Sequence, residues 1–434
     1  MKFPLFLRAL FIVGVTVVIL GAVWLIKGKI SERMYRANHV EQVFAMQTSG
    51  PQAVLGPFLL LTCERRGRQV ESDCPSQVFA PKVLRVKAHV PVETLYRGIY
   101  PIRQYKAATQ FSGQFEWPSA PTQETPYATS TWKHAYLVAT VTDPRGIKSL
   151  SIPGNASIDA RFAVRQDLGP YSAHKAGDAV PFDFSLLLAG TTNLSFTPVA
   201  DTNEFRVTSP WPHPAFNGEW APDERKVTAE GFEATWRISS QSTGGQPMWQ
   251  ATVARGDVFL GQGKNFQFGV SIINPLDIYT LSFRATEYAF LFVLFTFSAL
   301  ALTEVLAGIK LHPIQYLLVG SALAMFFLLL IALSEHIAFA YAYLAASAAC
   351  VSLLTIYLRH PLGTRTRTAA FFAMFAALYG TLYVLLQSED HAMLMGSLLV
   401  FAVLALTMLM TRRTDWSEIS RRMRQPVPTM AQPA

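Results

Sequence analysis

Residues Leu311–His336 read LHPIQYLLVGSALAMFFLLLIALSEH, and this stretch decides the fold. From Ile314 to Leu333 it carries no charged side chain. A helix of about 20 apolar residues is long enough to cross the hydrocarbon core of a bilayer. In water such a helix would be apolar on every side, so lipid is the better solvent for it. The stretch therefore predicts a transmembrane helix.

Similar apolar segments lie around this stretch, and one stands alone at the N-terminus. We predict an integral membrane α-helical bundle of six transmembrane helices, at Phe3–Ile26, Tyr288–Leu306, Ile314–Leu333, Ile337–Leu358, Ala369–Leu386 and Ala392–Met410. The first segment is longer than the core of a secretory signal, and Lys27-Gly28-Lys29 follows it instead of a small-residue cleavage site. We therefore expect an uncleaved anchor.

Composition divides the chain in the same way. The 434 residues are 51% hydrophobic and only 15% charged, against about 25% charged in typical soluble proteins. Residues 285–411 are poor in charge, whereas residues 27–284 have an ordinary soluble composition. We expect an N-terminal transmembrane anchor over 1–26, a water-exposed domain over 27–284, a five-helix bundle over 285–411 and a basic tail over 412–434.

The patterns inside the large insert are those of β-strands. Val83–Val90 alternates apolar with polar residues, a period of two that buries one face of a strand. Similar alternation occurs in Phe182–Leu188, Phe232–Ile238 and Phe266–Ile272. Glu32–Met46 is instead expected to continue the first span as a helix. The insert between the first and second transmembrane helices is therefore predicted to be mainly antiparallel β.

The short connections between the spans alternate in charge. Basic residues occur in the first connection, in the third and after the last span: Lys310; Arg359, Arg365 and Arg367; Arg412 and Arg413. The second and fourth connections contain acids and histidine but neither Lys nor Arg. Because short loops rich in Lys and Arg stay in the cytoplasm, both termini are predicted there and residues 27–284 in the periplasm of a bacterium. The basic residues that follow the first span, Lys27, Lys29, Arg33 and Arg36, argue mildly against this topology.

The charge and the cysteine content of the chain indicate which binding partners and metal sites to expect. The net charge of +8 does not indicate nucleic acid, because arginines directly after a span meet anionic lipid and no aromatic–basic motif accompanies them. Cys63 and Cys74 flank a polar stretch, ERRGRQVESD, that predicts a hairpin turn. In an oxidising compartment we expect a disulfide between them; the alternative is two unpaired thiols at a loop. No CxxC motif or histidine set accompanies them, so a zinc site is not expected.

Several motifs resemble the CreD family of bacterial inner-membrane proteins, and they run along nearly the whole chain. The most characteristic is Leu311–His336, and the others are Thr48–Pro51 with Gly56-Pro57, Ser209–Phe216 with Gly218, Gly231-Phe232 with Ala234 and Trp236, and Ala285–Ala289. The resemblance implies a role in cell-envelope integrity and an association with the Cre two-component sensor–regulator pair. It implies no established reaction and no catalytic residue. The segment with Cys63 and Cys74 is not part of the family pattern.

Two sets of polar residues are predicted at the outer membrane face. Glu335 and His336 end one span, and Glu389, Asp390 and His391 precede another. Ionisable groups near helix ends in lipid are costly unless they are hydrated or paired. The two loops could meet as a structural hydrogen-bond network or as a metal or proton site. The simpler interpretation, which we favour, is that hydrated loop residues enforce the topology.

A second candidate lies in the insert, at Trp211-Pro212-His213-Pro214. The prolines restrict the backbone here to extended conformations, so the segment is stiff. Trp211 and His213 are either a contact surface for a peptide or glycan or, as we favour, a corner that closes the β core. Small residues at helix-packing spacing, such as Gly320 with Ala324 and Ala376 with Gly380, predict close contacts between spans.

No motif for nucleotide, flavin, haem or zinc chemistry occurs, and no cofactor is predicted. The sequence favours a non-enzymatic factor for envelope integrity or envelope stress, whose outer domain contacts an envelope protein or cell-wall component while its helices contact lipid. A transporter or channel for a small solute or ion is the first alternative. Polar residues that face one another within the membrane would favour it. A membrane-coupled periplasmic hydrolase is the second alternative, and it would need a cleft with converging His and carboxylate groups.

Overall fold

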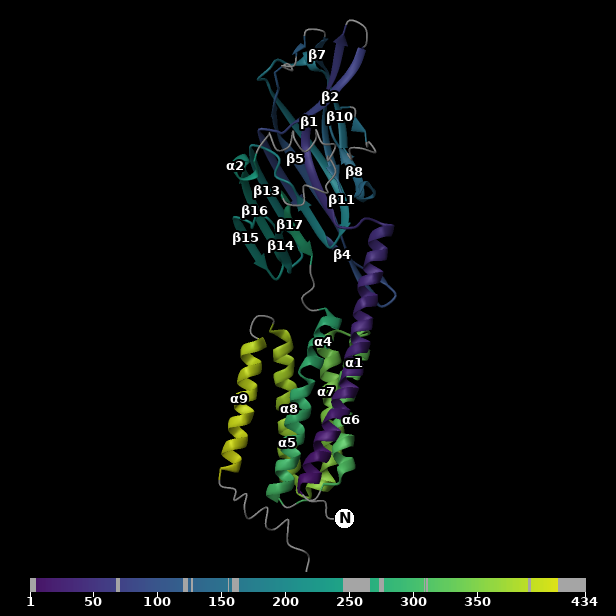
Figure 1. The fold of residues 1–434 in the computed structure, drawn as a ribbon, viewed down its shortest axis with the longest axis vertical. Helices are drawn as coiled ribbons and strands as arrows, with labels where there is room; N and C mark the ends of the chain where they lie inside the picture. The colour runs from purple at the N-terminus through teal and green to yellow at the C-terminus, as the bar shows by residue number, and fades with distance from the viewer. Residues whose placement is uncertain are drawn as a thin grey trace, which may run out of the picture. The chain divides into compact units, whose positions relative to one another are not determined.

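The computed structural model describes residues 5–67, 71–119, 124–125, 128–154, 156–157, 164–244, 266–272, 277–307, 309, 311–388 and 392–412. The chain forms two compact units, Met1–Ala37 with Leu276–Ala434 and Asn38–Pro275. We call the first the helical unit and the second the β unit. Helix α1, Leu5–Gln47, contributes residues to both units without a break (Figure 1). The predicted helical continuation of the first span is thereby confirmed.

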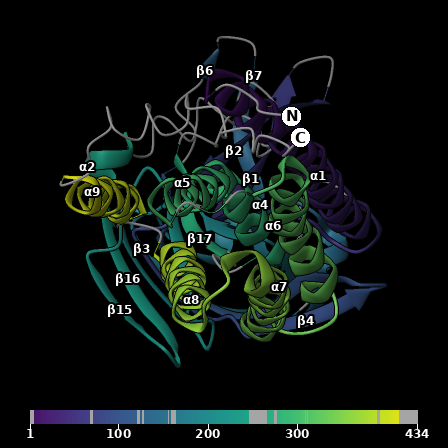
Figure 2. The ribbon, with the colours of Figure 1, turned by 90° about the horizontal axis from the view of Figure 1, so that it is seen from below.

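The helical unit is built from long apolar helices that follow the predicted spans. After α1 these are α4 (Ile278–Glu287), α5 (Ala289–Ala307), α6 (Pro313–Ser334), α7 (Phe339–Leu362), α8 (Arg365–Gln387) and α9 (Ala392–Thr411). Seen end-on, α7 stands between α6 and α8, and α9 stands at the margin (Figure 2).

Four helices in the described part of the chain, α1, α6, α7 and α8, are long and apolar enough to cross a membrane. A fifth span results if α4 and α5, bent by 41° against each other, count as one. The described apolar stretch of α9, Leu394–Leu409, is shorter. Six transmembrane helices therefore remain a prediction.

Local signals explain where α6, at the centre of this unit, begins. Pro313 opens the helix, and the Gln315 side chain accepts a hydrogen bond from the His312 backbone N–H (2.9 Å). Proline suits a first helical position because its missing N–H needs no partner there. The helix then packs closely at Gly320, where a Cβ would lie 2.6 Å from Cγ1 of Ile19 on α1 and 3.0 Å from Cζ of Phe297 on α5. The predicted close packing is confirmed at Gly320.

The β unit consists of two sheets, with nine and eight strands in the described residues. The nine-stranded sheet contains β1 (Gln52–Gly67), β2 (Glu71–Phe79), β6 (Glu124–Thr125), β7 (Ala128–Val141), β9 (Ala156–Ser157), β10 (Val164–Pro170), β12 (Asn193–Phe196), β14 (Pro214–Gly218) and β17 (Phe268–Ile272). The eight-stranded sheet contains β3 (Val83–His89), β4 (Val92–Arg97), β5 (Tyr100–Glu116), β8 (Ile147–Ser151), β11 (Ala179–Thr191), β13 (Thr202–Ser209), β15 (Glu224–Thr228) and β16 (Gly231–Ser239). Short helical turns, η1 (Pro144–Gly146), η2 (Tyr171–Ala173) and α2 (Ser240–Thr243), complete the unit.

The described strand pairs are antiparallel, except that β1 pairs with β12 and β3 with β13 in parallel. The two sheets share one apolar core, in which Phe205 of β13 meets Phe268 of β17 edge-on, with ring centres 4.8 Å apart. In β3 the exposure alternates along the strand, with Arg85, Lys87 and His89 outside, as the sequence predicted. A large, mainly antiparallel β domain between the first helix and the later helices is therefore present.

Candidate functional site

Two ion pairs bind α1 to neighbouring helices just beyond its apolar stretch. Lys27 Nζ lies 3.3 Å from Glu287 Oε1 and 4.3 Å from the centre of the Phe283 ring. Arg33 Nε lies 3.7 Å from Glu335 Oε1. We call Lys27, Arg33, Phe283, Glu287 and Glu335 the juxtamembrane cluster. It connects α1 with α4 and with the C-terminal end of α6.

The Glu335 side chain is only 11% exposed, whereas that of Arg33 is 46% exposed. Glu335 is the C-cap residue of α6, where the partial negative charge of the helix end disfavours an anion. The guanidinium of Arg33 offsets both this repulsion and the cost of removing the carboxylate from water. The pair therefore fixes α1 against α6.

Glu32 holds the other two cations that follow the first span. Its carboxylate lies 3.0 Å from Lys29 Nζ and 2.6 Å from Arg36 Nη2. The hydrogen bond from Lys29, and then that from Arg36, lowers the pKa of Glu32 below its ordinary value. Together with the juxtamembrane cluster, these contacts give a carboxylate partner to each basic residue that the sequence analysis found difficult to place.

The predicted outer-face polar set is only partly within the described structure. Glu335 pairs with Arg33, and the neighbouring His336 is exposed. Glu389, Asp390 and His391 lie outside the described residues, so a meeting of the two loops remains a prediction. Across the described ranges, no group of three or more His, Cys, Asp or Glu side chains is placed to hold a metal ion.

Where α1 ends, polar contacts attach it to the strands of the β unit. Arg145 Nη1 donates to the backbone oxygen of Met46 (2.7 Å), and Arg145 Nη2 donates to Asp143 Oδ2 (2.6 Å). The Ser49 hydroxyl donates to the Ala189 oxygen (2.9 Å), and the Gln52 amide exchanges two hydrogen bonds with the Asp143 backbone. We call Met46, Ser49, Gln52, Asp143 and Arg145 the stalk junction.

The stalk junction is tightly packed, and its two charged residues, Asp143 and Arg145, form an ion pair. Ser49 and Gln52 are buried, and a Cβ on Gly146 would lie 2.6 Å from the Gln52 amide nitrogen. The hydrogen bond from Arg145 lowers the pKa of Asp143 below its ordinary value. The segment Pro144–Gly146 forms the short turn η1, with the Asp143 side chain accepting from the Arg145 N–H. The junction thus holds the C-terminal turn of α1 in one position.

The predicted corner at Trp211 and His213 is partly buried and internally bonded. The Trp211 indole N–H donates to the His213 backbone oxygen (3.1 Å), and the Arg103 guanidinium lies 5.4 Å from the Trp211 ring centre. Trp211 packs against the β core, whereas His213 is exposed. This geometry agrees with a stiff corner, and a contact role for these residues remains a prediction.

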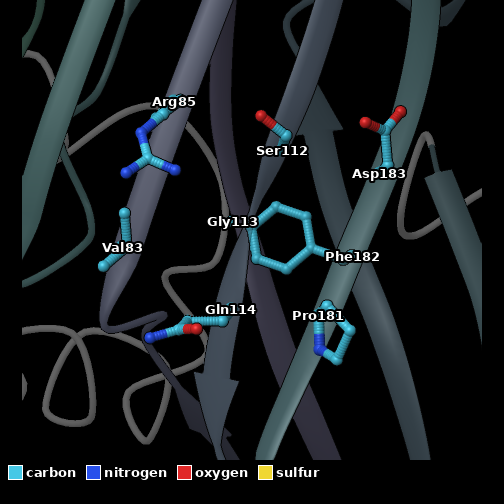
Figure 3. Close-up of a pocket in the computed structure, with 8 residues that line it drawn as sticks. All are labelled: Val83, Arg85, Ser112, Gly113, Gln114, Pro181, Phe182 and Asp183. Atoms are coloured by element: carbon cyan, nitrogen blue, oxygen red, sulfur yellow. The ribbon is translucent and has the colours of Figure 1, made fainter.

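A shallow cavity of about 530 Å³ lies on the eight-stranded sheet (Figure 3). Arg85 and Asp183 stand on either side of it, with Ser112 between them. The ring of Phe182 covers Gly113, its register partner, where a Cβ would lie only 2.7 Å from Phe182 Cζ. The ring of Phe182 therefore occupies the place that a side chain at position 113 would take. Its lining includes neither histidine nor lysine that could activate Ser112.

A second hollow, of about 690 Å³, lies between α7 and α8 and is lined by small and aromatic residues. Gly380, expected at a close helix contact, lies on its wall, and a Cβ there would meet nothing within 4 Å, so that expectation was wrong. The Tyr343 hydroxyl donates to the Tyr379 backbone oxygen (2.6 Å), and the Tyr379 hydroxyl to Cys350 Sγ (3.1 Å). These polar groups are engaged between helices, which indicates packing.

Comparison with known proteins now identifies the family. The family model described as inner membrane protein CreD matches residues 4–417. The chain is 32% identical to inner membrane protein CreD of Escherichia coli (strain K12), over 97% of this chain and 95% of that protein. The chain belongs to the CreD family. Membership in CreD, with several apolar helices, makes it a multi-pass inner-membrane protein. No solved structure matches the chain.

In the juxtamembrane cluster of this CreD-family chain, Glu335 was a candidate from the sequence, but its pairing with Arg33 and the pairing of Lys27 with Glu287 were not predicted. Lys27 and Glu287 are 260 residues apart, so no local pattern could pair them. One signal was available: basic residues on the side of a span that the topology disfavours require carboxylate partners. Glu287 and Glu335 stand at the ends of predicted spans and were suitable candidates.

Proposed function

We propose that this CreD-family protein supports cell-envelope integrity without catalysis, through contacts that its β unit makes in the periplasm. The observation that carries the proposal is the attachment of α1 in both units. The juxtamembrane cluster binds the helix to α4 and α6, and the stalk junction binds its C-terminal turn to the strands. A contact made by the β unit with an envelope protein or cell-wall component can then act on the membrane helices.

The proposed topology has both termini in the cytoplasm and residues 27–284 outside. The connections rich in Lys and Arg support it. Each of the cations after the first span has a carboxylate partner, and this gives them a structural role on the proposed outer side: Lys27, Lys29, Arg33 and Arg36.

Two observations support a role without chemistry. The lining of the cavity beside Ser112 contains neither histidine nor lysine, and the hydroxyls of Tyr343 and Tyr379 near the α7–α8 hollow donate to protein acceptors. Among the described residues, no specific contact favours either a hydrolase or a transporter. The name of the Escherichia coli relative states a location and no reaction.

The proposal is tested by reversing one ion pair in cells that lack the natural gene copy. Lys27→Glu and Glu287→Lys alone should each raise sensitivity to a membrane-perturbing detergent and release of a periplasmic marker enzyme. The double variant should restore both towards wild type, because the pair is re-formed with opposite polarity. Membrane levels of each variant are compared by immunoblot.

The matched control is Lys29→Glu, which reverses a charge on the same helix but whose partner, Glu32, belongs to α1 itself. We expect this variant to behave like wild type. If the single variants of the Lys27–Glu287 pair also protect the envelope fully at wild-type levels, the attachment of α1 does not carry the function.

A further inference from the structure

We propose that Cys63 and Cys74 form a cross-strand disulfide that fixes the pairing of β1 with β2 at the base of a polar extension of the sheet. The proposal rests on the periplasmic placement of the β unit proposed above. It starts from the backbone register, in which these two residues are direct partners in the antiparallel pair.

Direct partners in an antiparallel pair have Cα atoms about 4.5–5.5 Å apart, and disulfides span about 4.4–6.8 Å between Cα atoms. Direct partners also share one face of the sheet. On the other side of β1, the register partner of Cys63 is Trp132 of β7, which is buried. The register therefore places the two cysteine positions on the same face of the sheet as Trp132.

The place of the pair explains why a covalent link is useful there. The register shifts between Leu61 and Cys63 on the β2 side and between Thr62 and Cys63 on the β7 side. Beyond it, Glu64–Gly67 pairs with strand residues that are mostly polar, so the extension has little apolar side-chain content of its own. Register is weakly specified in polar strands, and a link at the bulge would prevent slippage.

The chemistry balances as a thiol–disulfide exchange. The two thiols lose two protons and two electrons as the S–S bond forms, and the disulfide of an oxidised thiol oxidoreductase accepts them and becomes a dithiol. An oxidising periplasm supplies such partners, whereas the cytoplasm keeps thiols reduced.

The test counts free thiols on the full-length protein in acid-quenched, denatured membranes, with a maleimide–polyethylene glycol that shifts the band once per thiol. We expect one adduct, at Cys350, before reduction and three after it, since the chain has 3 cysteines. Cys63→Ser and Cys74→Ser should each give two adducts under both conditions. Three adducts on the unreduced wild type would overturn the proposal, as would a disulfide-linked dimer on a non-reducing gel.

A separate measurement distinguishes this failure from a wrong topology. Ser185→Cys, at an exposed position of β11, is placed in a Cys63→Ser/Cys74→Ser background. Labelling by a membrane-impermeant maleimide in intact cells supports the periplasmic placement, so three adducts on the wild type would then reject the disulfide alone. Labelling only after lysis would reject the topology and the disulfide together.

Discussion

Two arginines of α1, Arg33 and Arg36, are expected to contribute differently to stability because their carboxylate partners differ in burial. Arg33 faces a nearly buried carboxylate on another helix, whereas Arg36 bonds to the more exposed Glu32 within its own helix. A buried polar group that loses its partner retains the cost of its desolvation, about 1–3 kcal/mol, and a charged group retains at least that much. Arg33→Met should therefore lower the apparent melting temperature of the purified protein in detergent, through a loss of about that size.

The same measurement supplies the control and the rescue. Arg36→Met should leave the melting temperature nearly unchanged, since its pair is exposed and screened. Adding Glu335→Gln to Arg33→Met should recover part of the loss, because it removes the unpaired charge. An Arg33→Met protein that melts like wild type would contradict the assigned role of this pair.

Asp143 makes the stability of the folded state depend on pH. Its pKa lies below the ordinary 3.8 because Arg145 donates hydrogen bonds to it. A lowered carboxylate pKa stabilises the folded state fully above the ordinary value, and this contribution is lost as the pH falls through the folded value. Asp143→Asn should therefore be less stable than wild type at neutral pH, and the difference should shrink below pH 3.8. Unfolding curves of both proteins at neutral pH and below pH 3.8 check this. A difference in stability that grows in acid would contradict the lowered pKa of Asp143.

At the scale of helices, Gly320 and Gly380 are a matched pair. A Cβ on Gly320 would overlap Ile19, whereas a Cβ on Gly380 would meet nothing within 4 Å. Overpacking a tight contact costs about 1–3 kcal/mol. Gly320→Ala should therefore destabilise the protein, and Ile19→Ala should partly rescue it, whereas Gly380→Ala should be neutral or slightly stabilising. Melting in detergent measures the three variants, and equal effects at the two glycines would contradict the packing.

Elements could be predicted from the sequence wherever one local pattern had one physical cause. The apolar spans are one example, and β3, which exposes one face to solvent and buries the other, is a second. Strand β1 was not singled out, because Gln52–Leu61 is buried on both faces and shows no alternation. The partners of Lys27 and Arg33 were missed because they depend on contacts between distant segments. Glu335 and Trp211 were named as candidates from the sequence, but the residues that contact them, Arg33 and Arg103, were not predicted.

At the scale of the whole molecule, the residues that the structure describes form two separate apolar cores. One contains residues only between Val54 and Ile272, and the other combines α1 with α4 to α8. A segment with its own core and internally bonded strands contains what a domain needs to fold. The β unit, Asn38–Pro275, should therefore fold without the membrane helices.

Residues 38–275, exported behind a cleavable secretion signal, should accumulate in the periplasm as a soluble, protease-resistant protein that unfolds cooperatively and shows a β-type circular dichroism spectrum. Trp236→Asp is the matched control, since Trp236 is fully buried in the β core, and a carboxylate there has no water to solvate it. This variant should be degraded or aggregate at the same expression level. If the unmodified segment is also recovered only as aggregates or fragments, its stability depends on the helical unit, and contacts with the β unit would then alter the fold of the whole molecule rather than act through α1.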